Sequence, residues 1–347
     1  MGGLVALYLL LRPLVFALEA EKAHRLTVAA LKLLPEGPAE PDPVLGVRVA
    51  GLDFPNPIGL AAGFDKDAEV FGQILRLGFG FTEVGTLTPR PQAGNKRPRL
   101  FRLAEDEAVI NRMGFNNKGQ EAARARLERR KRGGIVGINI GANKDSVDRI
   151  ADYADGARAM APLADYLTVN ISSPNTPGLR ALQDRAALDE LLAAVMEARG
   201  DTPIFLKVAP DLEPADIDDI AAVAMERKLD ALIVANTTIS RPPLKSRFRE
   251  EAGGLSGAPL KALALQRLRD FRSATGGALP LIAAGGIASG EDAFARIRAG
   301  ASLVQLYSAL VYAGPGLART IAKDLRVLLR REGFRTVAEA VGSGASA

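Results

Sequence analysis

Short apolar runs recur along the chain from about residue 45, with longer amphipathic stretches between them. The runs are continuously apolar, which is typical of parallel strands buried on both faces. Strands are expected at Ile58–Ala62, Phe81–Thr86, Ile135–Ile140, Tyr166–Ile171, Ile204–Val208, Ala231–Ala235, Leu281–Ala284 and Leu303–Tyr307. Helices are expected between them, for example at Leu188–Ala198, Pro214–Arg227, Leu260–Phe271 and Glu291–Ala299.

This alternation of strands and helices predicts a closed (β/α)8 TIM barrel of the α/β class. The alternative is an open doubly wound sheet, which often carries a glycine-rich nucleotide-binding motif. Gly78-Phe79-Gly80 continues into Phe81 without the third glycine of that motif. The residues after Gly141 also lack the spacing of a phosphate-binding loop. The barrel is therefore favoured.

An apolar segment precedes the barrel, and the proline-rich residues 35–43 separate the two. Pro13 is expected to end a first helix and to start a second segment, Leu14–Leu18. A further helix is expected from about Glu19 to Leu34, with an apolar face formed by Leu26, Ala30, Leu33 and Leu34. The first apolar run is too short to cross a bilayer, and it lacks the basic flank of a signal peptide.

Two interpretations of this N-terminal segment remain open. It could be a helical hairpin that buries its apolar face on the barrel, or a membrane-surface contact that forms an apolar tunnel for a lipid-soluble partner. Leu4, Leu7, Leu10 and Leu11 leave little polar surface on the first helix, which favours the second interpretation. The expected division is a helical extension at 1–43, a barrel at 44–332 and a frayed, flexible tail at 333–347.

Composition removes several kinds of chemistry. The 347 residues include no cysteine and one histidine, which excludes disulfides, cysteine nucleophiles and iron–sulfur clusters. Most histidine-based metal sites and a Ser-His-Asp triad are disfavoured, and no metal site is expected. The net charge is +5, but the densest basic run, Arg124–Arg132, contains Glu128 and is typical of a solvated helix end. With no tryptophan for base stacking, no nucleic-acid partner is expected.

Polar residues follow the expected strands at their carboxyl ends, where the loops of a barrel converge on the active site. They are Asp65-Lys66, Thr86, Asn139, Asn170, Lys207, Asn236-Thr237, Gly285-Gly286 and Tyr307-Ser308. Taken singly, each is explained equally well as a turn former or a helix cap. Their recurrence at equivalent positions favours one shared pocket. The glycine pair and Ser308 suit a phosphate, and the amides suit a planar heterocycle.

Several longer motifs resemble the dihydroorotate dehydrogenase family, the FMN enzymes of pyrimidine biosynthesis. The matching stretches are PIGLAAGFDK at 57–66, GTLTP at 85–89, NRMGFNN at 111–117, NISSPNTPGLR at 170–180, ANTT at 235–238, GGLSG at 253–257 and GGI at 285–287. Class 1 members use a cysteine base, whereas this chain offers Ser173 in the corresponding loop. Together with the N-terminal extension, this resembles the membrane-associated, quinone-dependent class 2.

The resemblance implies oxidation of (S)-dihydroorotate to orotate, with one FMN per chain as hydride acceptor and a ubiquinone-type quinone as final acceptor. Ser173 would be the general base, helped by Thr176 and by a water beside Phe115. The substrate would contact Lys66, Asn111, Arg112, Met113, Gly114, Phe115, Asn170, Asn175, Asn236 and Thr237. FMN would contact Ala62, Gly63, Lys66, Thr86, Asn139, Asn170, Lys207, Ala235, Gly257, Gly286, Tyr307 and Ser308.

The resemblance also places the quinone beside His24, Arg102 and Tyr307. The implied location is peripheral, on the cytoplasmic face of a bacterial membrane, since the chain lacks a leader resembling a transit peptide. Two positions depart from the family pattern. Val15 stands where some relatives have glutamine, which bears on the quinone pocket, and Ala235 stands where many have threonine.

Two other functions remain as alternatives. The chain could be another FMN barrel that acts on a pyrimidine, although such enzymes typically use a catalytic cysteine that is absent here. It could also be a non-catalytic, membrane-associated nucleotide-binding module that kept the fold. The retention of Ser173 and Lys66 argues against this second alternative.

Overall fold

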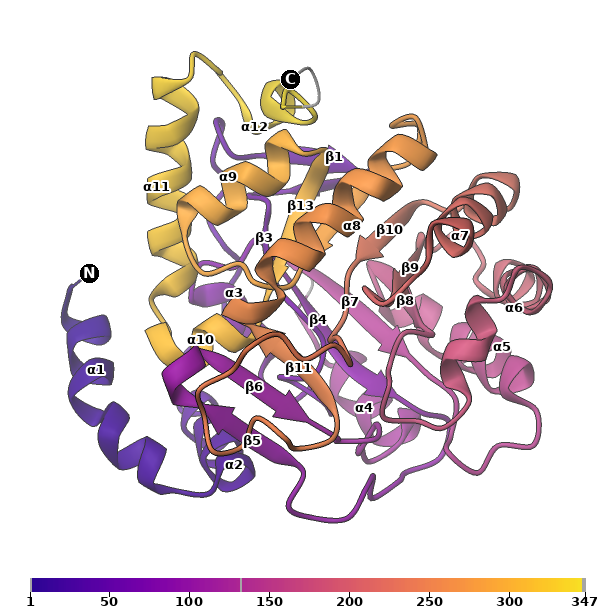
Figure 1. The fold of residues 1–347 in the computed structure, drawn as a ribbon, viewed down its shortest axis with the longest axis horizontal. Helices are drawn as coiled ribbons and strands as arrows, with labels where there is room; N and C mark the ends of the chain where they lie inside the picture. Colours follow the sequence, from indigo (N-terminus) through magenta and orange to yellow (C-terminus); the bar gives the residue numbers. More distant parts are fainter. Residues whose placement is uncertain (1, 132, 345–347) are drawn as a thin grey trace.

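The structure is a computed structural model that describes residues 2–131 and 133–344, with the backbone alone for residues 2–7. Parallel strands close into a barrel in the order β10-β12-β13-β3-β4-β7-β8-β9 (Figure 1). Their bounds are β3 Ile58–Leu60, β4 Phe81–Leu87, β7 Ile135–Ile140, β8 Tyr166–Asn170, β9 Ile204–Val208, β10 Ala231–Val234, β12 Leu281–Ala284 and β13 Ala301–Leu306. The predicted (β/α)8 barrel is confirmed, and every expected strand is present with only small shifts at its ends.

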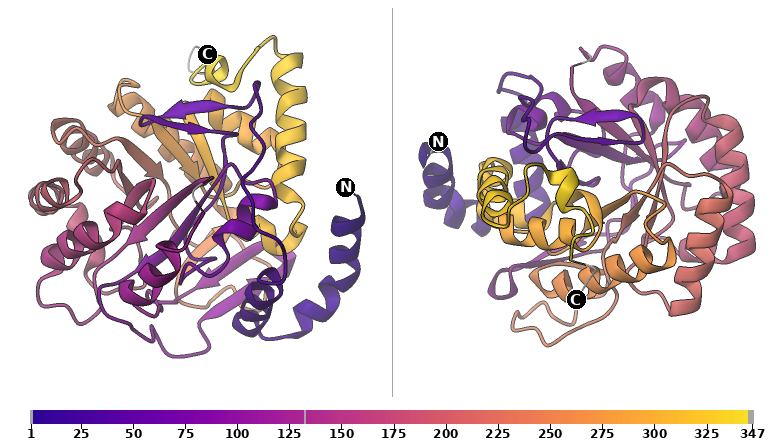
Figure 2. Two further views of the ribbon diagram at one scale, coloured as in Figure 1. Left: turned by 180° about the vertical axis from the view of Figure 1, so that it is seen from behind. Right: turned by 90° about the horizontal axis from the view of Figure 1, so that it is seen from above.

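Helices surround this barrel on its outside (Figure 2). They are α3 Phe71–Arg76, α4 Gln120–Leu127, α5 Arg149–Met160, α6 Arg185–Ala198, α7 Pro214–Glu226, α8 Lys261–Ala274, α9 Gly290–Arg298 and α11 Leu317–Arg331. Further helices are α1 Gly2–Ala17, α2 Ala20–Leu31, α10 Ser308–Ala313 and α12 Val337–Ala340. Short 3-10 turns lie at Ala104–Asp106, Ala161–Leu163, Leu179–Gln183 and Ala258–Leu260. The part of Arg124–Arg132 that the structure describes is the end of α4 and the turn after it, and Arg132 lies outside the described residues.

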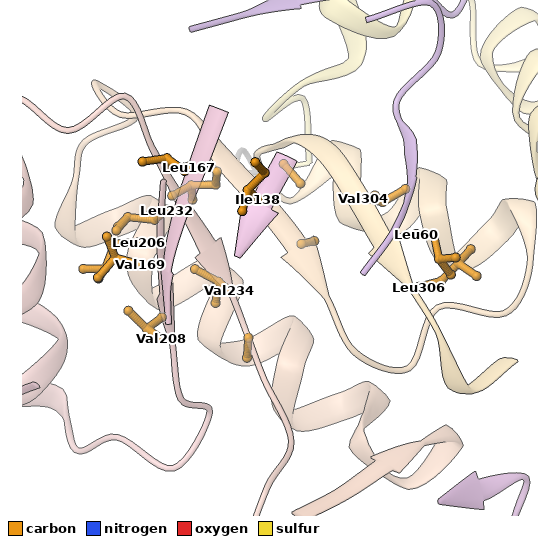
Figure 3. Close-up of a cluster of buried hydrophobic side chains, with 14 of the residues drawn as sticks. Leu60, Ile138, Leu167, Val169, Leu206, Val208, Leu232, Val234, Val304 and Leu306 are labelled. Atoms are coloured by element: carbon orange, nitrogen blue, oxygen red, sulfur yellow. The ribbon is translucent and has the colours of Figure 1, made fainter. Parts of the chain in front are cut away.

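The pleat of each barrel strand sends alternate side chains outward and inward. On β8, Leu167 and Val169 join the apolar cluster that includes the surrounding helices, and Leu206 and Val208 do the same on β9 (Figure 3). The alternating residues of the same strands point into the barrel. Among them, Tyr166 of β8 belongs to a separate interior cluster. The strands are therefore buried on both faces, as their continuous hydrophobicity predicts.

Aromatic rings fill the amino-terminal end of the barrel. The Phe81 ring lies 6.4 Å from that of Tyr166, and the Tyr166 ring stacks on Phe205 at 4.3 Å. A hairpin of β1 (Val47–Val49) and β2 (Leu52–Phe54) covers this end, and its Phe54 contacts Phe81 edge to face at 5.1 Å. This end of the barrel is therefore a packed core, and a ligand has room only at the other end.

A three-stranded antiparallel sheet lies outside the barrel and was not expected from the sequence. It consists of β5 (Leu100–Leu103), β6 (Ala108–Asn111) and β11 (Gly254–Gly257), in the order β11-β6-β5. Figure 1 shows it at the same end of the barrel as α2. The pairing of β11 with β6 joins segments far apart in the sequence, so no local pattern announces it.

The N-terminal segment forms two helices, and one expectation about it is wrong. Pro13 does not start a new segment, since α1 continues through it from Gly2 to Ala17 and loses only the hydrogen bond that a proline cannot donate. The expected apolar face of the second helix is open to solvent at Leu26 and at Leu33, which follows the end of α2, since their side chains are 59% and 86% exposed. The side chains of Leu4 and Leu7 lie outside the described residues. Within the described part of the chain, no helix is long and apolar enough to cross a membrane.

The expectation of a frayed C-terminal tail is wrong for residues 333–344. Val337 and Ala340 of α12 are fully buried, and the Val337 N–H donates to the Val44 carbonyl at 3.0 Å. The Gly344 N–H donates to the Arg298 carbonyl at 2.9 Å. The small residues of this segment pack against α9. A segment rich in small residues can therefore be ordered by packing, although its composition suggests a flexible tail. Residues 345–347 lie outside the described part.

A substitution at Gly59 tests whether the amino-terminal end of the barrel is close-packed. A Cβ at Gly59 would stand 2.2 Å from the Phe81 ring. Gly59→Ala should therefore lower the free energy of unfolding by about 1–3 kcal/mol through overpacking. Urea denaturation measures the change, and Gly133→Ala is the matched control because nothing lies within 4 Å of its added Cβ. Equal stability of the two variants would contradict close packing at the amino-terminal end of the barrel.

Candidate functional site

One cavity of about 1040 Å³ lies at the carboxyl ends of the barrel strands and continues between α1, α2 and α10. Most of the residues predicted from the sequence to bind substrate or FMN line it. They are Ala62, Gly63, Lys66, Thr86, Asn111, Met113, Gly114, Phe115, Asn170, Ser173, Asn175, Lys207, Ala235, Asn236, Thr237, Gly257, Gly286 and Ser308. The predicted quinone residues His24, Arg102 and Tyr307 line the same cavity.

Three predicted site residues lie outside this lining. The Arg112 guanidinium donates to Glu251 at 2.7 Å and lies over the Phe101 ring. Asn139 is fully buried inside the barrel, one layer below the cavity. Thr176 is buried beside the Ser173 loop, and its hydroxyl finds no hydrogen-bond partner among the described residues. Their contacts with ligands stay predictions.

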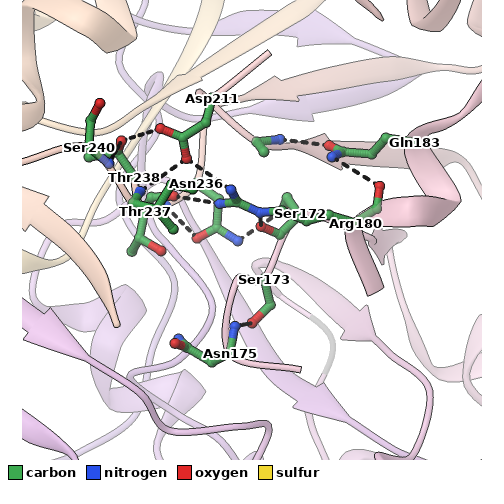
Figure 4. Close-up of polar contacts among 12 residues, drawn as sticks. Ser172, Ser173, Asn175, Arg180, Gln183, Asp211, Asn236, Thr237, Thr238 and Ser240 are labelled. Carbon is green, nitrogen blue, oxygen red and sulfur yellow. Dashed lines mark hydrogen bonds and ion pairs between the residues drawn. The ribbon is translucent and has the colours of Figure 1, made fainter. Parts of the chain in front are cut away.

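Ser173 lies on the loop that follows β8, and its side chain is almost fully buried (Figure 4). Its hydroxyl oxygen accepts a hydrogen bond from the Asn175 backbone N–H at 3.3 Å. The Asn175 side-chain amide in turn donates to Asn111 at 3.2 Å. The loop therefore presents the Ser173 hydroxyl and the Asn175 amide at the wall of the cavity, next to the Asn111 amide of β6.

A partly buried ion pair holds this loop against the loops that follow β9 and β10. Arg180 donates to Asp211 at 2.9 Å, to the Ser172 carbonyl at 3.0 Å and to the Thr237 carbonyl at 3.1 Å (Figure 4). Asp211 also accepts hydrogen bonds from the Thr238 hydroxyl and the Ile239 N–H. The guanidinium joins three loops with one side chain, which fixes the position of Ser173 relative to Asn236 and Thr237.

Two ionisable side chains follow β3. Burial raises the pKa of Asp65 to about 6, although its carboxylate accepts the N–H groups of Glu69 and Val70. Burial lowers the pKa of Lys66 to about 8, against the attraction of nearby carboxylates. The Lys66 ammonium donates to the Gly63 carbonyl and lines the cavity, so it supplies a positive charge there near neutral pH.

Lys207 of β9 places a second ammonium at the floor of the cavity. The side chain is 5% exposed, and burial lowers its pKa, while the charge of Glu83 on β4 raises it. Two lysines in a largely enclosed space favour an anionic or electron-rich ligand. Among the described residues, no cluster of three or more histidine, aspartate or glutamate side chains could hold a metal ion.

The opposite wall of the cavity is made of glycines and serines. Gly257 and Gly286 have positive φ angles of 95° and 69°, and a Cβ at either would meet backbone atoms at 2.3 and 2.4 Å. The Ser256 and Ser308 hydroxyls lie 2.7 Å apart beside them. Because these glycines leave the backbone bare, the wall can approach an anionic group closely, as the sequence predicted for a phosphate.

The other half of the cavity is aromatic and lies under the N-terminal helices. The His24 ring packs edge to face on Phe64 at 5.1 Å, and Phe64 packs in the same way on Tyr307 at 5.7 Å. Burial, together with the charge of Lys66, lowers the pKa of His24 to about 4. The imidazole is therefore neutral at physiological pH and can either donate or accept a hydrogen bond.

Arg102 of β5 caps the C-terminal end of α1. Its guanidinium donates to the carbonyls of Val15, Phe16 and Leu18 and lies 4.7 Å from the Phe16 ring. A cation suits the unpaired carbonyls of a helix C-terminus. Arg102 thus links the N-terminal helices to the three-stranded sheet at the rim of the cavity.

Glu21 anchors α2 to the barrel. Its buried carboxylate accepts hydrogen bonds from Arg99 at 2.8 and 3.0 Å and from Arg97 at 2.8 and 3.2 Å. Burial alone would raise the pKa of Glu21, but the hydrogen bonds of the two arginines outweigh it and lower the pKa to about 2. His24 lies one turn further along α2, so this ion cluster also sets its position.

Some residues that shape the site have no signal of their own in the sequence. Glu83 and Gln305 are polar positions inside otherwise apolar strands, which is the only hint that they point inward. Asp211, Glu21 and Arg99 belong to no motif, and their partners come from distant segments. Three-dimensional proximity alone reveals these contacts.

Comparison with known proteins gives consistent results. The sequence model of the family described as dihydroorotate dehydrogenase matches residues 44–329. A protein of Novosphingobium aromaticivorans named dihydroorotate dehydrogenase (quinone) is 65% identical over 97% of this chain and 99% of that protein. One of the same name from Sphingopyxis alaskensis is 66% identical over 98% of each. The crystal structure of a DHODH from Eimeria tenella in complex with ferulenol superimposes with a TM-score of 0.89, at 42% identity, over 94% of this chain and 96% of that one.

The Glu21 cluster offers a matched pair of variants. Arg99 is 5% exposed, whereas Arg97 is 60% exposed, and both bind the same carboxylate. Arg99→Met should lower the free energy of unfolding by about 3–5 kcal/mol, because it leaves a buried charge with one partner fewer. Arg97→Met should cost only about 0–1 kcal/mol, since water screens that pair. Urea denaturation at neutral pH measures both, and equal costs would contradict the anchoring role of the buried pair.

Proposed function

Since the chain belongs to the dihydroorotate dehydrogenase family, we propose that it oxidises (S)-dihydroorotate to orotate and passes the electrons to a ubiquinone-type quinone. Family membership makes it an oxidoreductase, and its relatives carry the quinone in their names. This reaction would serve the synthesis of pyrimidine nucleotides. The single observation that carries the proposal is one cavity lined both by Ser173 and the amides of the barrel rim and by His24 of α2.

The residues present fit FMN as the cofactor. Gln305 lines the floor of the cavity with a buried carbonyl oxygen that has no partner among the described residues, and a ring N–H of a flavin would satisfy it. The bare wall at Gly257, Gly286 and Ser308 suits the phosphate group. When bound, FMN accepts the hydride of the substrate and gives up the electrons to the quinone.

Ser173 acts as the general base that removes a proton from the substrate ring. A serine hydroxyl is a weak base, so it needs groups that stabilise its charge and carry its proton away. The Asn175 N–H donates to its oxygen, and the Thr176 hydroxyl, which has no hydrogen-bond partner in the described part of the chain, lies within the same loop. Phe115 lines the cavity as well, and a water held beside it would be a second route for the proton.

The substrate is an anion with a planar arrangement of amide groups, and the cavity offers complementary partners. Lys66 supplies the charge that attracts the carboxylate. Asn111, Asn175 and Asn236 supply amides that both donate and accept hydrogen bonds. Thr237 completes this polar wall beside Asn236.

The quinone enters through the N-terminal half of the cavity. Val15, Ala23 and Leu31 give this half an apolar lining, and its polar groups include His24 and Arg102. The departure at Val15 replaces a polar side chain with an apolar one, so the head group depends more on His24. A lipid-soluble acceptor suits such a lining better than a soluble dinucleotide does.

The exposed apolar face of the two helices rests on a membrane surface. Leu10 and Leu14 of α1, Leu26 of α2 and Leu33 just after α2 are between 59% and 86% exposed, which leaves large apolar side chains without cover. A monotopic contact would cover them and bring the mouth of the tunnel to the lipid. The location proposed is the cytoplasmic face of a bacterial cytoplasmic membrane.

The alternatives explain less of the site. A nucleotide-binding module would not need a buried hydroxyl base beside substrate amides, nor a tunnel under apolar helices. Another FMN barrel acting on a pyrimidine would require a different acid or base, because the chain has no cysteine.

Ser173→Ala should slow the reduction of bound flavin by dihydroorotate by about 10²–10⁴-fold, because the base is lost while the cavity is kept. Anaerobic stopped-flow absorbance measures this step directly, and the flavin content should match that of the wild type. Ser146→Ala, at a half-buried serine on another loop whose hydroxyl donates to the Asp148 carbonyl, should leave the rate unchanged. Wild-type flavin reduction in Ser173→Ala would reject Ser173 as the base.

His24→Ala should slow the reoxidation of flavin by a short-tailed quinone by about 10-fold, the size of one lost buried contact. Reduction by dihydroorotate should not change, because His24 lies in the other half of the cavity. Leu26→Ala is the control on the exposed face of the same helix and should leave both steps intact. A defect of His24→Ala confined to the dihydroorotate step would contradict the quinone assignment.

A further inference from the structure

Glu83 of β4 is a buried carboxylate inside the barrel and has no role in the reaction as described above. It is 1% exposed and receives hydrogen bonds from three other strands. Oε1 accepts from Asn139 at 2.7 Å, and Oε2 accepts from Gln305 at 2.9 Å, Thr168 at 3.0 Å and Tyr166 at 3.3 Å. A carboxylate is costly to bury, and four donors compensate for the lost water.

The carboxylate determines the orientation of the amide above it. An ionised Glu83 can only accept hydrogen bonds, so Asn139 must turn its NH2 group downward. The Asn139 carbonyl oxygen then faces the cavity end, where it accepts the Thr86 hydroxyl at 2.6 Å and the Asn170 amide at 3.0 Å. The Asn170 amide also donates to the Thr86 oxygen at 3.1 Å. Both hydrogens of Asn170 are thereby used.

The same polarity continues to the wall of the cavity. Since the Asn170 NH2 group points down, its carbonyl oxygen accepts the Ser172 hydroxyl at 3.1 Å. The Ser172 oxygen accepts the Asn236 amide at 2.8 Å. Asn170 and Asn236 both line the cavity, so the direction of each amide there follows step by step from Glu83.

Gln305 of β13 is oriented in the same way from the other side. Its NH2 group donates to Glu83, so its carbonyl oxygen is the end of the amide that points away from Glu83. That oxygen is buried and has no partner among the described residues, and Gln305 lines the cavity. The floor therefore presents a hydrogen-bond acceptor, which suits a planar ligand with a ring N–H.

We propose that Glu83 is a positioning residue, whose acceptor-only carboxylate fixes the direction of the Asn139, Asn170 and Gln305 amides so that the floor recognises the ring N–H edge of a flavin. This inference rests on the proposed function, since FMN is the ligand with such an edge. It adds a residue that touches neither substrate nor cofactor and acts only through its neighbours.

The isosteric variant Glu83→Gln tests the proposal. Its new NH2 group would face the NH2 group of either Asn139 or Gln305, so one of these two amides must turn over and reverse the polarity that it passes to the cavity. The apoprotein variant should bind FMN about 10-fold more weakly than the wild-type apoprotein, measured by quenching of FMN fluorescence. The absorption spectrum of the bound flavin should also shift, which a loss of stability alone would not cause.

A second substitution should restore the polarity. In the double variant Glu83→Gln with Gln305→Glu, the carboxylate moves across the 2.9 Å contact, and residue 305 again presents an acceptor to the cavity. FMN affinity should recover by at least about 5-fold relative to Glu83→Gln, because the two sites are coupled. Tyr166→Phe is the matched control, since it removes only the longest of the four bonds and keeps the carboxylate. Its FMN affinity should stay within about 3-fold of the wild type.

Wild-type FMN affinity in Glu83→Gln, or a loss that the second substitution does not recover, would overturn the proposal. If Glu83→Gln does not fold, the double variant decides alone, because it keeps the shape and the charge of the pair. In that case wild-type affinity supports the positioning role, and absent binding rejects it. Failure of wild-type apoprotein to bind FMN would instead reject the proposed function.

Discussion

The interior of a closed barrel admits only every second side chain of each strand, and this constraint governs the rest of the molecule. At the amino-terminal end, aromatic rings fill that space, and Gly59 and Gly137 make room for them. Above the rings lies a polar layer around Glu83, and above it smaller side chains leave the cavity open. The pocket exists because the side chains inside the barrel become smaller and more polar from its amino-terminal end to its carboxyl-terminal end.

The N-terminal helices extend this pocket, and their attachment is electrostatic as much as apolar. Their outer face stays exposed, while Glu21 holds α2 to the barrel through two arginines. The Tyr8 hydroxyl and Arg12 of α1 donate to the carbonyls of Val311 and Tyr312 in α10. The helices therefore expose apolar surface on their outer side and still form a wall of the cavity.

Sequence patterns predict the barrel well because burial on both faces leaves a strong local signal in each strand. The cavity lining was predicted through motifs whose glycines, serine and amides lie at strand ends. The three-stranded sheet, the Glu21 cluster and the network of Glu83 could not be predicted, because each joins segments far apart along the chain. Pro13 and the C-terminal tail show the opposite failure, since their local signals were overridden by the helix and by packing.

The central claim is that one cavity carries electrons from dihydroorotate to a quinone. The most direct test is the absorption spectrum of the purified protein under anaerobic conditions, recorded first with dihydroorotate and then with a soluble quinone. The account predicts a yellow protein whose flavin absorbance is bleached by dihydroorotate and restored by the quinone. A colourless protein that takes up no FMN, or a bound flavin that dihydroorotate leaves oxidised, would contradict it.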